Sequence, residues 1–257
     1  MRRARVAYAG AVHEATPVPG DAGDSERIRL ADGRVLAQTD VVWLPPFEVG
    51  TIVALGLNYA DHARELAFNS QEEPLVFLKG PNALIGHRGQ TRRPADATHM
   101  HYECELAVVI GRHARRVRQA DAMNHVAGYC VANDYAIRDY LENWYRPNLR
   151  TKNRDTCTVI GPWLVDRDDI VDPMALELRT RVNGVITQRG NTANMIYSIA
   201  WLIEYLSAFM TLAPGDVILT GTPEGVIDVK SGDEVVTEID GFGSLISTIV
   251  GDAAFGR

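Results

Sequence analysis

The stretch HYECELAVVIG, residues 101–111, decides more about this chain than any other part of it. Side chains alternate across a β-strand, so Glu103 and Glu105 share one face while Leu106 points to the other. The stretch is therefore predicted to form a strand with two carboxylates about 7 Å apart on one face. Ala107 lies on the same face as the carboxylates, and an apolar residue there makes a solvent-exposed face less expected.

Two carboxylates at this spacing repel each other, and a divalent cation between them removes the repulsion. Asp134 follows the apolar run Tyr129–Asn133 and would add a third carboxylate. A site made of carboxylates alone favours Mg²⁺, Mn²⁺ or Ca²⁺ over zinc. From the residues alone two alternatives stay open: a solvated face for Glu103 and Glu105, and a helix N-cap role for Asp134.

A second metal interpretation uses the histidines that precede the strand. His99, His101 and Glu105 form a His-x-His-x3-Glu pattern that resembles the first metal motif of cupins. The companion motif of cupins ends in histidine. The corresponding position here holds Asp228, which weakens the cupin interpretation.

The composition narrows the class of protein. The chain has 257 residues and a formal net charge of −7, which argues against nucleic acid or an anionic membrane as a partner. Three cysteines without a CxxC pair exclude a disulfide framework and a zinc ribbon. No apolar segment follows the basic N-terminus, so no secretory signal is expected and the predicted location is cytoplasmic.

The longest apolar run, residues 193–212, raises the question of a membrane span. Glu204 lies inside the run, and Met195, Ile199 and Leu202 recur at steps of three and four. This spacing favours a buried amphipathic helix over a transmembrane one.

The pattern along the chain predicts a mixed α+β, mostly β protein. Residues 1–46 are expected to form a small N-terminal β segment, with a hairpin turn at Asp32-Gly33, and residues 47–257 a larger catalytic domain. Strands are predicted at 51–57, 75–79, 103–110, 127–133, 176–182, 216–220, 234–239 and 245–250. Helices are predicted at 60–67, 119–126, 136–143 and 194–209.

Seven motifs occur in order over residues 50–250 and together resemble the fumarylacetoacetate hydrolase superfamily. They are LGLNYADHAREL, PLVFLKGPNALIG, HYECELAVVIG, GYCVANDYAIRDY, KNRDTCTVIGPWLV, the run from Met195 to Val226, and GDEVVTEIDGFGSL. Residues 139–163 most resemble the branch that serves homoprotocatechuate breakdown. Some members of that branch are tandem chains, and this sequence carries one unit.

The resemblance implies a β-roll fold, usually in a homodimer, and assigns roles to nine residues. The metal ligands would be Glu103, Glu105 and Asp134, holding Mg²⁺ or Mn²⁺, with Ca²⁺ as an alternative occupant in a crystal. Lys152 would be catalytic, and His62 with Glu65 would form an acid–base dyad on a lid that orders when substrate binds. Asn58, Arg138 and Thr222 would bind the substrate, and Arg146 or Arg150 would be candidates for its distal carboxylate.

The implied activity is a metal-dependent decarboxylase, a keto–enol isomerase, or both. The substrate would be a 2-oxo-3-ene-dioate from the breakdown of 4-hydroxyphenylacetate and homoprotocatechuate, processed through a metal-bound dienolate. Members that hydrolyse acylpyruvates carry glutamine to place the attacking water. The matching position here is Leu141, which cannot bind water. The alternatives are a C–C hydrolase of acylpyruvate or fumarylacetoacetate type, an oxaloacetate-type decarboxylase, and a non-catalytic binder of 2-oxo acids.

Overall fold

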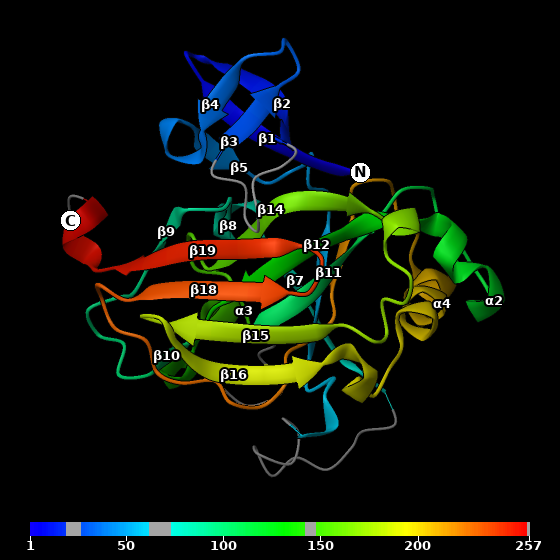
Figure 1. Ribbon diagram of the computed structural model, residues 1–257. Helices are drawn as coiled ribbons and strands as arrows, with labels where there is room; N and C mark the ends of the chain where they lie inside the picture. The colour runs from blue at the N-terminus through cyan, green and yellow to red at the C-terminus, as the bar shows by residue number, and fades with distance from the viewer. Residues whose placement is uncertain (19–26, 62–72, 142–147, 256–257) are drawn as a thin grey trace.

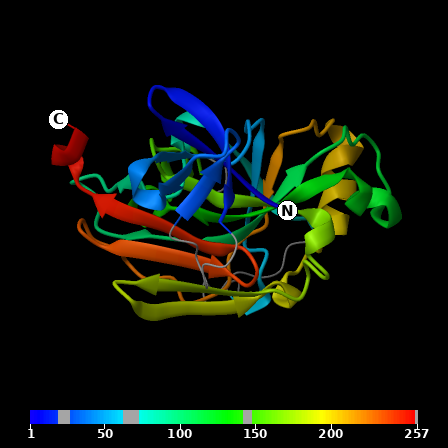
Figure 2. The ribbon, with the colours of Figure 1, turned by 45° about the horizontal axis from the view of Figure 1, so that its top comes forward.

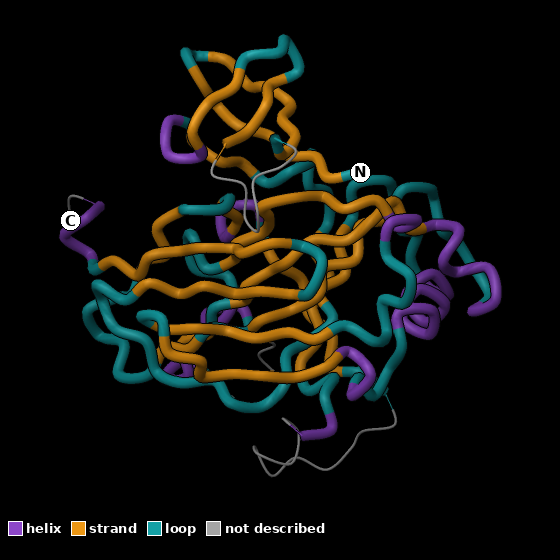
Figure 3. The backbone as a smooth tube through the Cα atoms, viewed as in Figure 1, coloured by secondary structure: helices purple, strands orange, loops and turns teal. Residues whose placement is uncertain are grey.

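Most of the fold consists of β-sheet, in two layers (Figure 1). The computed structural model describes residues 1–18, 27–61, 73–141 and 148–255. Figure 3 shows how strands dominate the described part of the chain, of which helices make up only a small share. The predicted fold class, mixed α+β and mostly β, is confirmed.

Over the described residues the larger sheet has 12 strands, with β14, β12, β11 and β17 side by side at its centre. Its strands are β1 (Arg2–Tyr8), β2 (Ala11–Pro17), β3 (Arg27–Leu30), β4 (Val35–Ala37), β5 (Val42–Leu44), β6 (Ile52–Gly56), β7 (Leu75–Lys79), β8 (Leu84–Ile85), β11 (Cys104–Ile110), β12 (Val126–Asp134), β14 (Thr158–Asp166) and β17 (Val217–Leu219).

The second layer is a smaller sheet in the order β16-β15-β18-β19-β9, visible beneath the central strands in Figure 2. Its strands are β9 (Gly89–Arg92), β15 (Glu177–Val182), β16 (Val185–Asn191), β18 (Glu234–Ile239) and β19 (Gly243–Val250). β10 (Met100–His101) pairs with β13 (Ala136–Ile137), and the described helices are α2 (Gln119–Ala122), α3 (Leu149–Lys152) and α4 (Ile199–Phe209).

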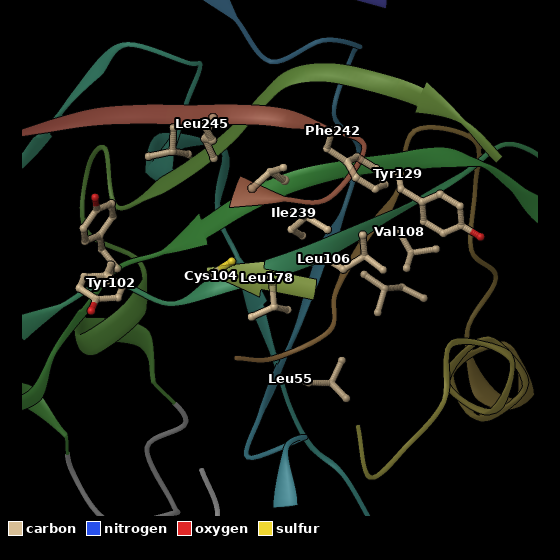
Figure 4. Packing of buried hydrophobic residues seen from close by; sticks show 14 of the residues in the cluster. Leu55, Tyr102, Cys104, Leu106, Val108, Tyr129, Leu178, Ile239, Phe242 and Leu245 are labelled. Carbon is tan, nitrogen blue, oxygen red and sulfur yellow. The ribbon is translucent and has the colours of Figure 1, made fainter. Parts of the chain in front are cut away.

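The main hydrophobic core fills the space between the two layers. Leu106 and Val108 of β11 pack there with Leu178, Ile239 and Leu245 of the smaller sheet (Figure 4). Burying this apolar surface is the main favourable contribution to folding.

The opposite face of β11 is also dry. Ala107 and Val109, on the face that carries the glutamates, belong to a second buried cluster with Ile52 and Phe77. The solvated-face alternative for the glutamates is therefore wrong.

All eight predicted strands are present, with shifts of one or two residues at their ends. The hairpin at Asp32-Gly33 is also present, because β3 pairs antiparallel with β4 around it. α4 starts at Ile199, later than predicted, where the Ser198 hydroxyl accepts a hydrogen bond from the Trp201 N–H at 3.3 Å. None of the described helices is long and apolar enough to cross a membrane.

The predicted helix at residues 136–143 is wrong over its described part. Ala136 and Ile137 pair with β10, and a single 3-10 turn (Arg138–Tyr140) follows. The Arg138 N–H donates to the carbonyl of His99 at 2.9 Å. Pairing with a distant strand has overridden a helix-like apolar spacing.

Candidate metal centre

The pairing of β11 with β12 brings three carboxylates to one point. Cys104 lies opposite Asn133, and the Asp134 N–H donates to the carbonyl of Glu103 at 3.0 Å. Because of this register, Glu103, Glu105 and Asp134 share one face of the sheet. Each offers an oxygen, and these oxygens lie within 4.8 Å of one another. Their exposed fractions are only 7%, 0% and 0%.

Glu105 is the most constrained of the three. Its Oε2 accepts a hydrogen bond from the Gly221 N–H at 2.8 Å, whereas its buried Oε1 makes no hydrogen bond to any described residue. Burial, and then the charges of Asp134 and Glu103, raise the pKa of this carboxyl well above its usual value. An all-oxygen donor set with one unsatisfied oxygen fits a hard divalent cation.

Lys152 lies directly beside these carboxylates. Its Nζ is 2.5 Å from Glu103 Oε2 and 3.0 Å from Asp134 Oδ2. Burial lowers the pKa of Lys152, but the attraction of Asp134, Glu103 and Glu105 outweighs burial, so its pKa is raised overall. The side chain is therefore a fixed ammonium at neutral pH, able to hold an anion.

A second lysine, which was not predicted from the sequence, compensates part of the remaining negative charge. Lys79, at the end of β7, pairs with Asp134 Oδ1 and also donates to the carbonyl of Lys152. Asp134 thus lies between two ammonium groups, and its side chain is not a helix N-cap. A signal was available: Lys79 has the same strand parity as the buried Phe77, a position where an unpaired lysine would be costly.

The side chain of Asn58 is held by hydrogen bonds to two backbone groups. Its Nδ2 donates to the carbonyl of Thr220 at 2.8 Å, and its Oδ1 accepts from the Tyr197 N–H at 2.8 Å. These bonds hold the end of β6 against the loop that contains Gly221. A Cβ at Gly221 (φ +88°) would lie 3.0 Å from Asn58 Cβ, so glycine lets the amide reach Glu105. Asn58 thus positions this loop, and its predicted contact with the substrate stays a prediction.

A cavity opens beside the carboxylates and contains two of the predicted substrate residues. Arg138, Thr222, Lys152 and Glu103 all line it. Thr222 Oγ1 accepts a hydrogen bond from Gln188 Nε2 at 2.9 Å, which directs its own O–H elsewhere. Apolar side chains complete the wall: Leu55, Leu57, Leu75, Phe77 and Leu141. The lining thus combines charged and polar groups with apolar side chains.

Some of the predicted residues cannot be placed in this cluster. His62, Glu65 and Arg146 lie outside the described residues. Arg150 stacks on the ring of Tyr140, with Cζ 3.9 Å from its centroid, and is not among the described residues that line the cavity. His101 is buried with Nδ1 3.1 Å from the carbonyl of Tyr102.

This two-layer fold and its buried acidic cluster define a family. The chain belongs to the fumarylacetoacetate hydrolase family, because the family model "Fumarylacetoacetate (FAA) hydrolase C-terminal" matches residues 51–250. The resemblance seen in the sequence is confirmed, and the cupin interpretation is set aside.

Three similar proteins are informative. The 4-hydroxyphenylacetate degradation bifunctional isomerase/decarboxylase of Salmonella dublin is 60% identical over 206 residues, which are 80% of this chain and 48% of that protein. The chain thus spans about half the length of this curated relative. The structure of 5-carboxymethyl-2-hydroxymuconate delta-isomerase from Mycobacterium smegmatis has a TM-score of 0.85 at 39% identity, covering 98% of this chain and 99% of that one.

A more distant neighbour has a bound metal. Fumarylpyruvate hydrolase from Pseudomonas aeruginosa, solved with Mn²⁺ and pyruvate, has a TM-score of 0.75 at 33% identity, covering 82% of this chain and 92% of that one.

Proposed function

We propose that this chain is a divalent-metal-dependent decarboxylase, keto–enol isomerase or both, acting on a 2-oxo-3-ene-dioate from 4-hydroxyphenylacetate or homoprotocatechuate breakdown. The observation that carries the proposal is the buried cluster of three carboxylates and two lysines beside a cavity lined by Arg138 and Leu141. The similarity to an isomerase/decarboxylase and to an isomerase structure supports the choice of substrate class.

Glu103, Glu105 and Asp134 would hold the cation, Mg²⁺ or Mn²⁺. When bound, such a cation supplies Lewis-acid polarisation of a 2-oxo group and stabilises the charge that develops on its oxygen. Three carboxylates with Lys79 and Lys152 carry a net −1, so a dication makes the cluster +1. Arg138 raises this to +2, which matches the two carboxylates of a dioate.

The chain's own groups would divide the remaining work. Arg138 can hold a substrate carboxylate through two parallel hydrogen bonds, and the Thr222 hydroxyl can donate to it because Gln188 already donates to the Thr222 oxygen. Lys152, kept protonated by its neighbours, stabilises the developing enolate charge. The buried side chains of Leu55 and Phe77 in the lining would limit water near the reacting carbons.

Proton delivery to the dienolate is assigned to His62, oriented by Glu65. This assignment comes from the family motif alone, and a variant tests it. His62→Ala should slow proton transfer while binding of Mg²⁺ and oxalate stays intact. Wild-type turnover in that variant would return His62 to an ordinary surface role.

The activity is tested by following the ultraviolet spectrum of a conjugated 2-oxo-3-ene-dioate with protein and Mg²⁺. Bleaching with one CO₂ released per substrate identifies a decarboxylase, and a spectral change without CO₂ an isomerase. Release of a carboxylic acid by C–C cleavage would instead support a hydrolase such as the fumarylpyruvate enzyme. No change of any kind would leave a binding protein and overturn the proposal.

We further propose that the molecule acts as a homodimer, with residues 1–46 as a separate N-terminal β segment attached to a catalytic domain at 47–257. Sedimentation equilibrium, which measures the mass of the particle in solution, tests the homodimer.

The division at residue 46 is supported by the pairing of β1. This strand pairs with β14 through Arg2 and Arg3 and with β2 and β5 over its remaining length. Deleting residues 1–46 while retaining Mg²⁺ binding would support separate units.

A further inference from the structure

The short helix that carries Lys152 has few internal contacts to hold it in place. α3 is a single turn, and no side chain caps its N-terminus. A turn of this length is not stable by itself, because ordering its backbone costs more free energy than its hydrogen bonds return. Lys152 Nζ is nevertheless held against Glu103 and Asp134. Contacts outside the helix must therefore fix the position of Lys152.

Asn153, directly after Lys152, supplies such contacts. Its backbone N–H donates to the carbonyl of Leu149 at 3.0 Å and so ends the helix. Its side chain reaches the end of β7, where Oδ1 accepts from the Gly80 N–H at 2.6 Å and Nδ2 donates to the carbonyl of Leu78 at 3.0 Å. These bonds need an acceptor and a donor on one side chain, which an amide offers and an ionised carboxylate does not.

The two backbone groups that Asn153 binds lie on either side of Lys79. Along a strand, the carbonyl of one residue and the N–H of the second residue after it point to the same edge. β7 pairs with β6 on one edge and ends the strand order of the larger sheet, so no further described strand covers the other edge. The amide of Asn153 thus takes the place of a neighbouring strand at the point where Lys79 leaves the sheet.

Further contacts join the two lysines directly. The carbonyl of Lys152 accepts hydrogen bonds from Lys79 Nζ and from Cys157 Sγ, the latter at 2.9 Å. Lys79 and Lys152 also bind the two different carboxylate oxygens of Asp134. A shift of either lysine would therefore disturb the other, and Asn153 fixes the distance between the two segments that carry them.

Asn153 itself does not take part in the carboxylate cluster. It is not among the described residues that line the cavity beside the cluster. The hydrogen bonds that its side chain makes to described residues go to the backbone of Leu78 and Gly80. Any effect of Asn153 on the site must therefore pass through the lysines that it positions.

We propose that Asn153 is a positioning residue, which joins α3 to β7 so that the ammonium group of Lys152 stays directed at the substrate oxygen bound in the metal centre. This inference depends on the proposed function, in which Lys152 stabilises the developing enolate charge. A displacement of about 1 Å is enough to cost up to about 100-fold in rate, so the precision of this contact matters for catalysis.

The test is a double-mutant cycle. Asn153→Leu keeps the approximate size of the side chain and removes both hydrogen bonds to β7. The matched control is Asn82→Leu, because Asn82 Nδ2 donates to the carbonyl of Asn153 at 2.9 Å and to Asp155 Oδ1 at 3.1 Å, and so holds the same segment without bonding to β7. Each variant is made in the wild-type and the Lys152→Met backgrounds.

Two measurements are made on the whole chain loaded with Mg²⁺: kcat in the ultraviolet assay, and the affinity for oxalate by calorimetry. Asn153→Leu should lower both about tenfold in the wild-type background and less than about twofold in the Lys152→Met background, since the lysine through which it acts is then absent. Asn82→Leu should change both less than about twofold in either background.

A tenfold loss that persists in the Lys152→Met background, or equal losses in Asn153→Leu and Asn82→Leu, would overturn the proposal. So would unchanged kcat and oxalate affinity in Asn153→Leu. The oxalate measurement needs no turnover, so a coupled loss of oxalate affinity without any wild-type turnover would support the positioning role and reject the proposed activity. If Asn153→Leu does not fold, Asn153→Ala provides the same comparison.

Discussion

The carboxylate cluster and the surroundings of His87, which lies between β8 and β9, bury titratable groups in opposite ways. At the cluster, burial raises the pKa of Glu105, and Lys79 and Lys152 compensate the charges of its neighbours. In the second region, burial lowers the pKa of His87 to about 3, and the ring stays neutral. Buried charge is tolerated only where opposite charge lies close by. The carboxylate cluster therefore holds buried charge, whereas the buried ring of His87 stays uncharged.

The largest effect on metal binding and turnover should come from replacing a carboxylate of the cluster. Glu105→Gln removes one of three carboxylates, so Mg²⁺ affinity and turnover should both fall more than about 100-fold. Calorimetry with Mg²⁺ and the ultraviolet assay measure the two effects. Glu234→Gln, an exposed strand glutamate, is the control. Chelator treatment of the wild type should also abolish turnover, and full activity in a rigorously metal-free sample would refute the metal assignment.

Variants of Lys79 and Lys152 can distinguish compensation of the carboxylate charges from contact with the substrate. Lys152→Met and Lys79→Met each leave Asp134 with one cation fewer, so each should destabilise the fold by about 3 kcal/mol in urea titrations. Only Lys152 lines the cavity, so Lys152→Met should lower kcat about 100-fold and Lys79→Met less than tenfold. Unchanged kcat in Lys152→Met would reduce that lysine to a structural counter-ion.

The uncharged ring of His87 should make the free energy of unfolding depend on pH. Because the folded-state pKa of His87 lies below its unfolded value of about 6.5, its contribution to stability is complete above pH 6.5 and is lost as pH falls toward 3. By pH 5 the loss should reach about 2 kcal/mol. Urea unfolding of His87→Asn should lack this component. An identical pH dependence in the variant and the wild type would show that the ring does not titrate on unfolding.

The smallest effect should come from Gln188, which positions Thr222 without lining the carboxylate cavity. Its Nε2 donates to Thr222 Oγ1 and to the carbonyl of Pro223, and its Oε1 accepts from Thr180 Oγ1. Gln188→Leu should raise KM about fivefold with little change in kcat, since one hydrogen bond that orients a substrate contact is lost. A fall in kcat with unchanged KM would instead mean that Gln188 acts on the reaction itself.

What the sequence reveals depends on how local the interaction is. Glu103 and Glu105 are predicted from the alternation of one strand, and Asp134 from its place after the apolar run Tyr129–Asn133. Lys79 was not predicted as a site residue because its partner Asp134 lies 55 residues away and only the strand parity of Lys79 indicates burial. β14 was not predicted because Pro162 interrupts its apolar run, and the structure places Pro162 where the register with β12 shifts.

The cation site can form only when β11 and β12 pair in the correct register during folding. A slip of one residue would send Asp134 to the opposite face from Glu105, so the three oxygens converge only after these central strands have joined correctly. Cation capture would thus be a late event in folding. An ion that binds only the correctly paired sheet would stabilise it relative to every chain with a slipped register. Cation binding would thus favour the correct register of the sheet that forms the site.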